Sequence, residues 1–553
     1  MGTLMSKQSD GAVRGADALV KALALGGVKK IFTLSGNHIM PVFDAAFDAG
    51  LELIHTRHEA ATVHMADAFA RITGEVGVAL VTGGPGHANA ISALYTAQMA
   101  ESPVVLLSGH APLSQLGKGA FQEMRQADLA APVCKVSWTC MSADEIATDI
   151  ARAISVARSG RPGPVHLSLP TDVLEAMTSE ALPSADAFDP VQQALHEADA
   201  DAIVTRLRAA SRPLILTGPV SLTRAYRERM AALEVASGIP VIGMESPRGV
   251  TDPSLGAFAE CLAESDCVLL LGKRLDFTLK FGSTPTFAAD CAWLQIDSEW
   301  IEVDRARNAV GQSLEASFVA DAASAIDMLK QSTRWNRNAA NAWFDKVRAS
   351  VAFRPPAWAN ATTATTDISG RLHPVQALRP LQALLDAHPD SVFISDGGEI
   401  GQWAQALLSA PHRVINGVAG AIGAAIPFAL AARVALPNAP VIAVMGDGTF
   451  GFHCAEFDTA VRYGLPFVAV IGNDARWNAE YQIQLRDYGS DRTIGCELLP
   501  SHYDQVAKAF GGYGESVNSA AELGTAFLRA AESKLPACVN VFIDGLPAPN
   551  IRR

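Results

Sequence analysis

The sequence predicts an α/β protein with three domains, each built on a doubly wound parallel sheet. Its 553 residues correspond to about three domains of ordinary size. Near the amino end, the apolar run 76–81 leads into a glycine-rich turn, a helical stretch and a second apolar run at 103–107. The same order returns at 417–445, and the apolar runs 212–218 and 266–272 indicate a third unit between them. Helices alternating with short buried strands are typical of parallel sheets covered by helices.

Two segments rich in Pro, Ala, Ser and Asp separate the three units, at 182–190 and at 354–372. They lack the apolar periodicity of a helix or strand, which is typical of connections between domains. We therefore expect domain boundaries within these two segments. The expected domains comprise residues 1–185, 186–360 and 361–553.

Composition and charge exclude several classes of function. With 49% hydrophobic and 18% charged residues, the chain has the composition of a globular enzyme. A net charge of −13 argues against nucleic acid and anionic membranes as main partners. No apolar run approaches the roughly 20 residues of a membrane span, and no signal-peptide pattern is present. Eight cysteines without a C-x-x-C pair favour reduced thiols and a cytoplasmic protein.

Two aspartates follow two neighbouring strands of the predicted carboxyl-terminal sheet. The apolar run 441–445 ends in a Gly-Asp-Gly turn that contains Asp447, and the run 467–471 ends just before Asp474. Because one strand–helix–strand unit joins them, both carboxylates should lie at the same carboxyl edge of the sheet, where ligands bind. Mg²⁺ prefers a few carboxylates together with phosphate oxygens. The pattern therefore predicts a magnesium–diphosphate site; an ordinary turn with chance acids is the alternative.

This segment resembles the cofactor signature of thiamine-diphosphate enzymes, in which a GDG turn is followed at this spacing by an Asn pair. Asp474 stands where the family usually has Asn, which adds a negative charge but keeps an oxygen ligand. Over nearly the whole chain, the domain order resembles that of the acetolactate-synthase and pyruvate-oxidase type. Within this superfamily, the chain looks most similar to benzaldehyde lyase and 2-hydroxyacyl-CoA lyase. The resemblance implies pyrimidine-binding, middle and diphosphate-binding domains, in that order. The implied ligands of Mg²⁺ and thiamine diphosphate are Asp447, Gly448, Thr449, Asp474 and the backbone carbonyl of Arg476.

Glu59 is the candidate acid for activating the cofactor. It lies at the start of a predicted helix, where a glutamate paired with Arg57 or His58 would be the ordinary interpretation. The surrounding R-H-E-A-A and A-D-A-F-A-R segments, however, resemble the glutamate region of the family. The resemblance implies that Glu59 protonates N1′ of the aminopyrimidine, so that the 4′-imine takes the C2 proton. It also implies cofactor contacts from Pro85 and Asn89.

Two glycine turns are expected to contact the cofactor in the third domain. Between Gly420 and Gly423, Ile422 supplies the bulky apolar side chain that a bent thiamine needs beneath it. A dinucleotide fingerprint is the competing interpretation, but the spacing is G-x-x-G-x-x-G and no acid follows before the GDG turn. The second turn, with Gly398 and Glu399, is used for the diphosphate in the family.

Three polar residues in the first domain bear on the choice of reaction. His38 and its neighbour Asn37 lie in the turn after the first strand, where benzaldehyde lyase has a histidine at the position of His38 and a small residue at that of Asn37. The resemblance implies that His38 transfers a proton to the substrate hydroxyl or carbonyl. Asn37, and Asn416 in place of a histidine, depart from benzaldehyde lyase and make the pocket more polar, which argues against an aromatic benzoin substrate. Gln122 matches the family glutamine that reaches the thiazolium and substrate. Structural roles are the alternative for His38 and Gln122.

The resemblance implies a carbon–carbon lyase or carboligase that depends on thiamine diphosphate and Mg²⁺. Its substrate would be an α-hydroxy carbonyl compound, either a 2-hydroxyacyl-CoA or a 2-hydroxy ketone, processed through a C2 ylide and an enamine. An acetolactate-synthase-like or 2-oxoacid decarboxylase activity is the alternative, favoured by G-A-F-Q-E at 119–123. A non-catalytic, cofactor-binding homologue is a third, against which Glu59 and Asp447 argue.

The family's use of two subunits for one site implies a homodimer or homotetramer with sites at the subunit interface. In the middle domain, Lys273, Arg274 and Lys280 follow an apolar run and suit the phosphates of FAD, ADP or coenzyme A. An ordinary basic surface is an equal interpretation of these three residues. FAD or ADP is therefore a doubtful second cofactor.

Overall fold

The computed structural model describes residues 11–335, 342–361 and 371–553. It forms two compact units, unit 1 (Met1–Ala70 and Glu75–Val191) and unit 2 (Arg71–Gly74 and Gln192–Arg553). Unit 1 contains one large parallel sheet and unit 2 contains two, which confirms the predicted α/β class with three parallel-sheet domains. Part of the predicted boundary segment 354–372 lies outside the described residues.

Unit 1 is built on a six-stranded sheet with the order β3-β2-β4-β5-β7-β6, in which all neighbours are parallel. Its strands are β2 (Lys30–Thr33), β3 (Glu52–His55), β4 (Gly77–Val81), β5 (Val104–His110), β6 (Ser137–Thr139) and β7 (Val165–Pro170). The antiparallel pair β1 (Val13–Arg14) and β8 (Met177–Thr178) is separate. Its helices are α1 (Gly15–Leu25), α2 (Met40–Ala49), α3 (Glu59–Thr73), α4 (Pro85–Met99), α5 (Gln126–Ala130), α6 (Ile146–Arg158) and α7 (Thr171–Glu175).

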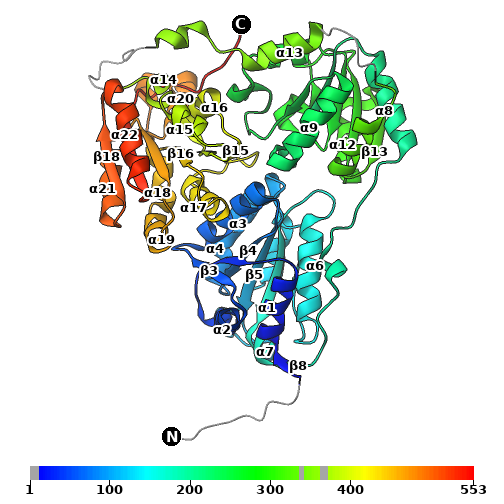
Figure 1. Ribbon diagram of the computed structural model, residues 1–553, viewed down its shortest axis with the longest axis vertical. Coiled ribbons are helices and arrows are strands. Elements are labelled where there is room, and N and C mark those ends of the chain that lie inside the picture. The colour runs from blue at the N-terminus through cyan, green and yellow to red at the C-terminus, as the bar shows by residue number, and fades with distance from the viewer. Residues whose placement is uncertain (1–10, 336–341, 362–370) are drawn as a thin grey trace, which may run out of the picture. The chain divides into compact units, whose positions relative to one another are not determined.

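The central strands of unit 1 are buried on both faces, as their continuous apolar sequences require. Every residue of β4 and β5 is buried. Alternate residues such as Val78 and Leu80 join one core with helices α1, α2 and α6, so Ala79 and Val81 face the opposite side of the sheet. Figure 1 shows helices α3 and α4 behind the sheet and α1 and α6 in front of it.

The middle sheet of unit 2 has the order β10-β9-β11-β12-β13 and is parallel throughout. Its strands are β9 (Pro213–Thr217), β10 (Val241–Gly243), β11 (Cys267–Leu271), β12 (Ala292–Asp297) and β13 (Leu314–Val319). Its helices are α8 (Glu197–Ala209), α9 (Arg224–Ser237), α10 (Ala259–Glu264), α11 (Trp300–Val310), α12 (Ala322–Gln331) and α13 (Ala342–Ala352). Separate apolar cores cover its two faces.

The carboxyl-terminal sheet of unit 2 has the order β15-β14-β16-β17-β19-β18, also parallel. Its strands are β14 (Val392–Ser395), β15 (His412–Ile415), β16 (Val441–Gly446), β17 (Val468–Asn473), β18 (Tyr513–Val517) and β19 (Ala537–Phe542). Its helices are α14 (Pro374–Leu378), α15 (Leu381–Asp386), α16 (Gly398–Leu407), α17 (Ala425–Ala435), α18 (Asp447–His453), α19 (Glu456–Arg462), α20 (Asn478–Tyr488), α21 (Tyr503–Ala509) and α22 (Ala520–Glu532).

The sheets at the two ends of the chain share one topology. Counted within each sheet, the strand order is 2-1-3-4-6-5 in both. In such a sheet the order reverses beside the first strand, and ligands bind outside the carboxyl ends of the strands at that reversal. In the last sheet this point lies between β14 and β16, where the sequence predicts the cofactor turns.

Candidate functional site

A cavity of about 70 Å³ lies at the carboxyl edge of the last sheet, where β14, β16 and β17 end. It gathers most of the residues predicted to bind the diphosphate and metal. They are Gly398, Glu399, Ile422, Asp447, Gly448, Thr449, Asp474 and Arg476. Gly420 is not in the cavity wall but lies on an exposed turn next to it. Other residues of the cavity wall are Gly397, Trp477 and Asn478.

Asp447 and Asp474 are both buried at this edge, with 2% and 6% of their surface exposed. Burial raises the pKa of Asp447, although the backbone amides of Gly448, Ala475 and Arg476 oppose this by hydrogen bonding to its carboxylate. Burial also raises the pKa of Asp474, and the negative charge of Asp447 raises it further, while Arg476 and Arg371 act in the opposite direction. Two acids that repel each other in a buried site need a cation to be ionised together.

The residues fit a divalent cation that carries a diphosphate. Oδ2 of Asp447 is buried and has no hydrogen-bond partner among the described residues, so an acceptor is left for a ligand. Within those same residues, no three His, Cys, Asp or Glu side chains cluster as a metal site. Two carboxylates cannot complete the octahedron that Mg²⁺ requires, which leaves positions for a backbone carbonyl, phosphate oxygens and water.

The raised pKa values give a prediction for the protein without cofactor and metal. An acid whose pKa is higher in the folded chain binds its proton more tightly there, so folded stability falls as pH rises above the ordinary aspartate value. In EDTA, we expect the temperature at the midpoint of thermal unfolding to be lower at pH 8 than at pH 5. We expect a smaller fall for Asp474→Asn, because the variant lacks one of the two titrating acids. An equal fall in the two proteins, followed by circular dichroism, would contradict this assignment.

The turn that carries Ile422 is fixed by Asp396, a residue that was not among the predicted site residues. The buried carboxylate of Asp396 accepts hydrogen bonds from the backbone amides of Gly397 (2.7 Å), Gly423 (2.9 Å) and Ala425 (3.0 Å). Burial raises the pKa of Asp396 to about 6, against the effect of these three amides. A Cβ on Gly397 would lie 2.6 Å from Cγ2 of Ile422, so only glycine allows the two turns to approach this closely. One carboxylate thus joins both predicted glycine turns.

Two other contacts shape the cavity wall. Nη2 of Arg248, in the middle part of unit 2, lies 2.9 Å from Oε2 of Glu399. Burial raises the pKa of Glu399, and the charge of Arg248 opposes that rise. On the other side, the Trp477 ring covers Gly448, since a Cβ there would lie 2.6 Å from the indole. Glycine at this position therefore brings the backbone of the GDG turn against an aromatic wall.

In unit 1, Glu59 begins α3, as the sequence predicts, and is buried. Nδ2 of Asn89 donates a hydrogen bond to Oε2 of Glu59 over 3.0 Å. Pro85 begins α4 one helical turn before Asn89. A Cβ on Gly86 would lie 3.2 Å from Oε1 of Glu59, so the start of α4 packs directly against the carboxyl group. The structure brings Glu59 and Asn89 into contact, with Pro85 on the same helix as Asn89.

Gln122 lies beside the glycine turn that precedes α4. It adopts a φ of 57°, which is unusual for a residue other than glycine. A Cβ on Gly84 would lie 2.8 Å from Cβ of Gln122, so the two backbones approach closely. The buried Gln126 side chain accepts a hydrogen bond from the Gly84 amide (2.8 Å) and donates to the carbonyl of Gly109 (3.1 Å). Strained backbone of this kind is frequent at functional sites.

His38 is buried in a short 3₁₀ helix, Asn37–Ile39, that follows β2. Its Nδ1 lies 3.2 Å from Oγ1 of Thr82, and its ring stacks on Phe121 with centroids 6.0 Å apart. Burial lowers the pKa of His38 from its ordinary value, a hydrogen bond with the Phe121 backbone opposes this, and nearby His110 lowers it further. This direction favours the neutral form of the imidazole. Asn37 is exposed.

The basic residues of the middle sheet are engaged within the fold. Lys273 is buried, and its Nζ donates to Oγ1 of Thr278 over 2.7 Å. Nε of Arg274 lies 3.3 Å from Oε1 of Glu302. Lys280 is exposed. These contacts do not favour a phosphate-binding role for Lys273 and Arg274, and FAD or ADP binding stays a prediction.

Two observations concern the environment of the chain. None of the described helices combines the length and apolar content that crossing a bilayer would require. All eight cysteines lie in the described residues and are free thiols, and seven of them are buried.

Comparisons with known proteins identify the family. Three models of thiamine pyrophosphate enzymes match, the N-terminal TPP binding domain at 13–129, the central domain at 200–329 and the C-terminal TPP binding domain at 396–541. The chain is 31% identical over 544 residues to the acetolactate synthase large subunit IlvG of Mycobacterium tuberculosis, covering 95% of each chain. It is 30% identical over 569 residues to 2-hydroxyacyl-CoA lyase 2 of Homo sapiens, covering 92% of this chain and 86% of the relative. The protein of the same name from Caenorhabditis elegans is 30% identical over 554 residues, with 91% and 84% covered. The chain therefore belongs to the thiamine pyrophosphate enzyme family.

Proposed function

We propose that the protein is a Mg²⁺-dependent carbon–carbon lyase that cleaves the bond beside the hydroxyl group of an α-hydroxy carbonyl compound. Its first candidate substrate class is a 2-hydroxyacyl-CoA, because relatives with that activity in their name share 30% of their residues with this chain. Bound thiamine diphosphate supplies the carbanion chemistry. The same residues serve the reverse direction, in which two carbonyl compounds are ligated.

The observation that carries this proposal is the buried imidazole of His38, whose Nδ1 lies 3.2 Å from Oγ1 of Thr82. Cleavage beside a hydroxyl group requires that the hydroxyl proton leaves as the carbon–carbon bond breaks. A neutral imidazole, oriented by Thr82, accepts that proton. Release of CO₂ from a 2-oxo acid needs no base at a hydroxyl group, whereas release of the aldehyde product does. His38 would therefore serve a lyase at its bond-breaking step and a decarboxylase at product release.

Other residues would bind and orient the cofactor. Asp447 and Asp474 would hold Mg²⁺, with the Arg476 carbonyl as a third ligand. Ile422 would support the bent ring, and Glu59 would hold a proton at N1′ of the aminopyrimidine. Gln122, on its strained turn beside Gly84, would contact the substrate, and Asn37 would make its surroundings more polar.

An acetolactate-synthase-like activity is the second candidate. The 31% identity to an acetolactate synthase over nearly the whole chain supports it as well as the lyase relatives support the first candidate. Purified protein with Mg²⁺ and thiamine diphosphate should be incubated separately with pyruvate, benzoin and a 2-hydroxyacyl-CoA. Aldehyde from the thioester or from benzoin supports the lyase, whereas CO₂ from pyruvate overturns it in favour of the second candidate. No turnover of any substrate favours a non-catalytic homologue.

Replacing His38 by Ala separates catalysis from cofactor binding. We expect kcat to fall by about 10²–10⁴, the usual contribution of a general acid or base. The dissociation constant of thiamine diphosphate, followed by tryptophan fluorescence, should not change. The matched control is His196→Ala, because His196 is exposed and precedes α8. Unchanged kcat, or loss of cofactor binding, would contradict the role assigned to His38.

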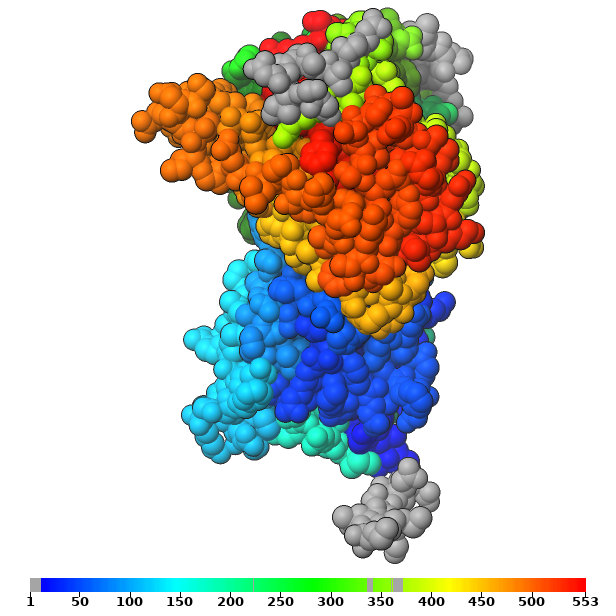
Figure 2. Space-filling model, turned by 90° about the vertical axis from the view of Figure 1, so that its left-hand side faces the viewer, coloured from blue at the N-terminus to red at the C-terminus, as the bar shows by residue number. Residues whose placement is uncertain are grey.

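We further propose that the protein is a homodimer or homotetramer, with each site shared between subunits. The segment formed by α20 and the residues up to 499 carries large exposed apolar side chains, and Figure 2 shows it in orange, standing out from the surface. These side chains are Ile483, Tyr488, Ile494 and Leu499. Several large apolar side chains exposed on one segment are typical of surfaces that bind another protein chain. Active monomers in analytical ultracentrifugation would overturn the proposal.

The cytoplasmic location stays a prediction.

A further inference from the structure

A second cavity, of about 260 Å³, lies at the opposite edge of the carboxyl-terminal sheet, where the strands begin. β16 enters it with Val441 and Ile442, and β17 enters it with Val468. The far ends of these strands carry Gly446 and Asn473, next to the two aspartates of the cofactor site. This cavity is therefore separate from the site described above, at the other end of the same two strands.

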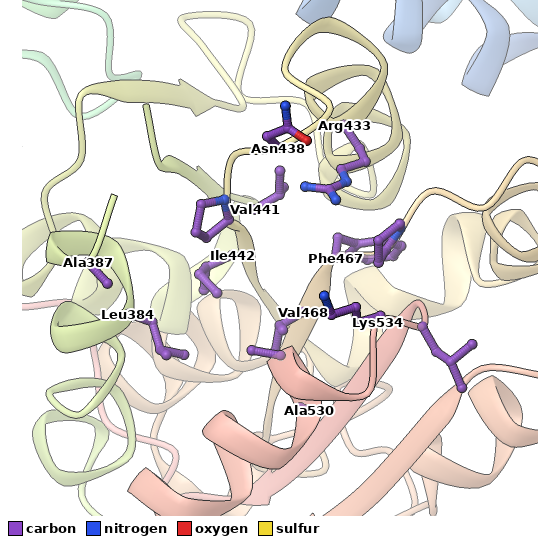
Figure 3. Close-up of a pocket in the computed structure, with 14 residues that line it drawn as sticks. Leu384, Ala387, Arg433, Asn438, Val441, Ile442, Phe467, Val468, Ala530 and Lys534 are labelled. Carbon is purple, nitrogen blue, oxygen red and sulfur yellow. The ribbon is translucent and has the colours of Figure 1, made fainter. Parts of the chain in front are cut away.

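Most of the wall is apolar, and it comes from both faces of the sheet edge (Figure 3). Its apolar side chains include those of Leu384, Ile442, Phe467, Val468 and Ala530. A cavity of this volume has room for several water-sized groups. An apolar hollow of this size suits a chain of a few carbon atoms.

Two cations face this apolar space. Arg433 lies in the last turn of α17, and Lys534 follows α22 with a φ of 54°. Figure 3 shows the Arg433 guanidinium and the Lys534 amine turned toward the same space from opposite sides. Nη1 of Arg433 donates to the carbonyl of Ala439 over 2.6 Å, and burial lowers the pKa of Arg433. No carboxylate among the described residues pairs with either cation.

An anion would lower the electrostatic free energy of this arrangement. Two like charges repel across the hollow, and Arg433 has lost part of its hydration to burial without gaining a counter-ion. A carboxylate between the two cations would form charge-assisted hydrogen bonds with both. The apolar wall would then contact the remainder of the same molecule.

We propose that this cavity binds a small monocarboxylate with an apolar tail of about five to seven carbon atoms. The carboxylate lies between Arg433 and Lys534, and the tail contacts Ile442, Val468 and Ala530. A dianion without a tail, such as inorganic phosphate, would use the cations but leave the apolar wall in contact with water. The proposal does not depend on the catalytic reaction, because every residue of the cavity lies at the other edge of the sheet.

Calorimetric titration of the full-length protein with hexanoate tests the proposal. We expect saturable binding to one site per chain, and weaker binding of 1-hexanol, which has the tail without the charge. Lys534→Met should weaken hexanoate binding about tenfold or more, the usual effect of losing a hydrogen bond to a charged group. Ala530→Phe should abolish binding by filling the cavity.

The controls separate this site from a general effect of charge or folding. Lys508→Met removes an exposed lysine on α21 of the same domain and should leave hexanoate binding unchanged. Lys534 is exposed, so its replacement leaves the core intact even if the larger Phe at position 530 disturbs folding. The proposal is overturned if hexanoate does not bind. It is also overturned if Lys534→Met binds hexanoate as tightly as the natural chain, or if phosphate binds as tightly as hexanoate.

Discussion

Glu59→Gln is expected to abolish exchange of the C2 proton of bound thiamine diphosphate and to lower kcat by about 10²–10⁴. Glutamine has nearly the same shape, and its carbonyl oxygen can accept the hydrogen bond that Asn89 donates to Glu59. The fold at the start of α3 should therefore persist. A carboxamide cannot protonate N1′ of the aminopyrimidine, so the effect falls on cofactor activation alone.

The measurement is proton NMR of the cofactor after brief exposure of the complex to D₂O and acid quenching. Glu175→Gln is the matched control, because Glu175 is an exposed acid on α7 of the same unit. The control should exchange at the natural rate, and both variants should keep their unfolding temperature. Exchange at the natural rate in Glu59→Gln would remove Glu59 from the mechanism.

Asp447→Ala is expected to weaken Mg²⁺-dependent binding of thiamine diphosphate by more than about a hundredfold. Loss of a residue that only orients a metal ligand costs about ten- to a hundredfold in metal affinity, and loss of a ligand should cost more. The carboxylate of Asp447 is buried at the start of α18, and its Oδ2 has no partner among the described residues. Without it, only the carboxylate of Asp474 remains as a side-chain ligand among those proposed for the cation.

Asp474→Asn provides the contrast, because an amide oxygen still binds Mg²⁺ and the repulsion between the two acids is removed. We expect this variant to retain cofactor binding. Asp491→Ala, which removes an exposed acid near α20, is the control for surface charge. Titration with Mg²⁺ at fixed thiamine diphosphate, read by tryptophan fluorescence, distinguishes the three variants. Undiminished affinity in Asp447→Ala would place the metal elsewhere.

The sequence predicted those features that follow from local pattern and parallel topology. The runs before Asp447 and Asp474 are continuous and apolar, so they read as buried parallel strands, and such strands end at a common edge. Glu59 was predicted at a helix start, and α3 begins there. In the middle sheet, β9 and β11 were predicted for the same reason. The short β10 and the partly polar β13 have no such signal and were missed.

The parts of the candidate site that were not predicted from the sequence depend on long-range contacts. Arg248 meets Glu399 across 151 positions, and nothing in the local sequence of either residue indicates the other. Asp396 had a usable signal, since it is an acid directly after a buried strand at the carboxyl edge. Its partners, the amides of Gly423 and Ala425, became visible only once the fold placed the two turns side by side.

The hydrogen bonds of Asp396 affect the entropy cost of binding the cofactor. Because three backbone amides hold this carboxylate, the turn that carries Ile422 is preorganised as soon as the chain has folded. Ordering a loop on association normally consumes part of the binding free energy as lost entropy. Here that entropy is lost during folding and does not weaken binding of the cofactor. More of the free energy of binding could then hold thiamine diphosphate in its bent, reactive conformation.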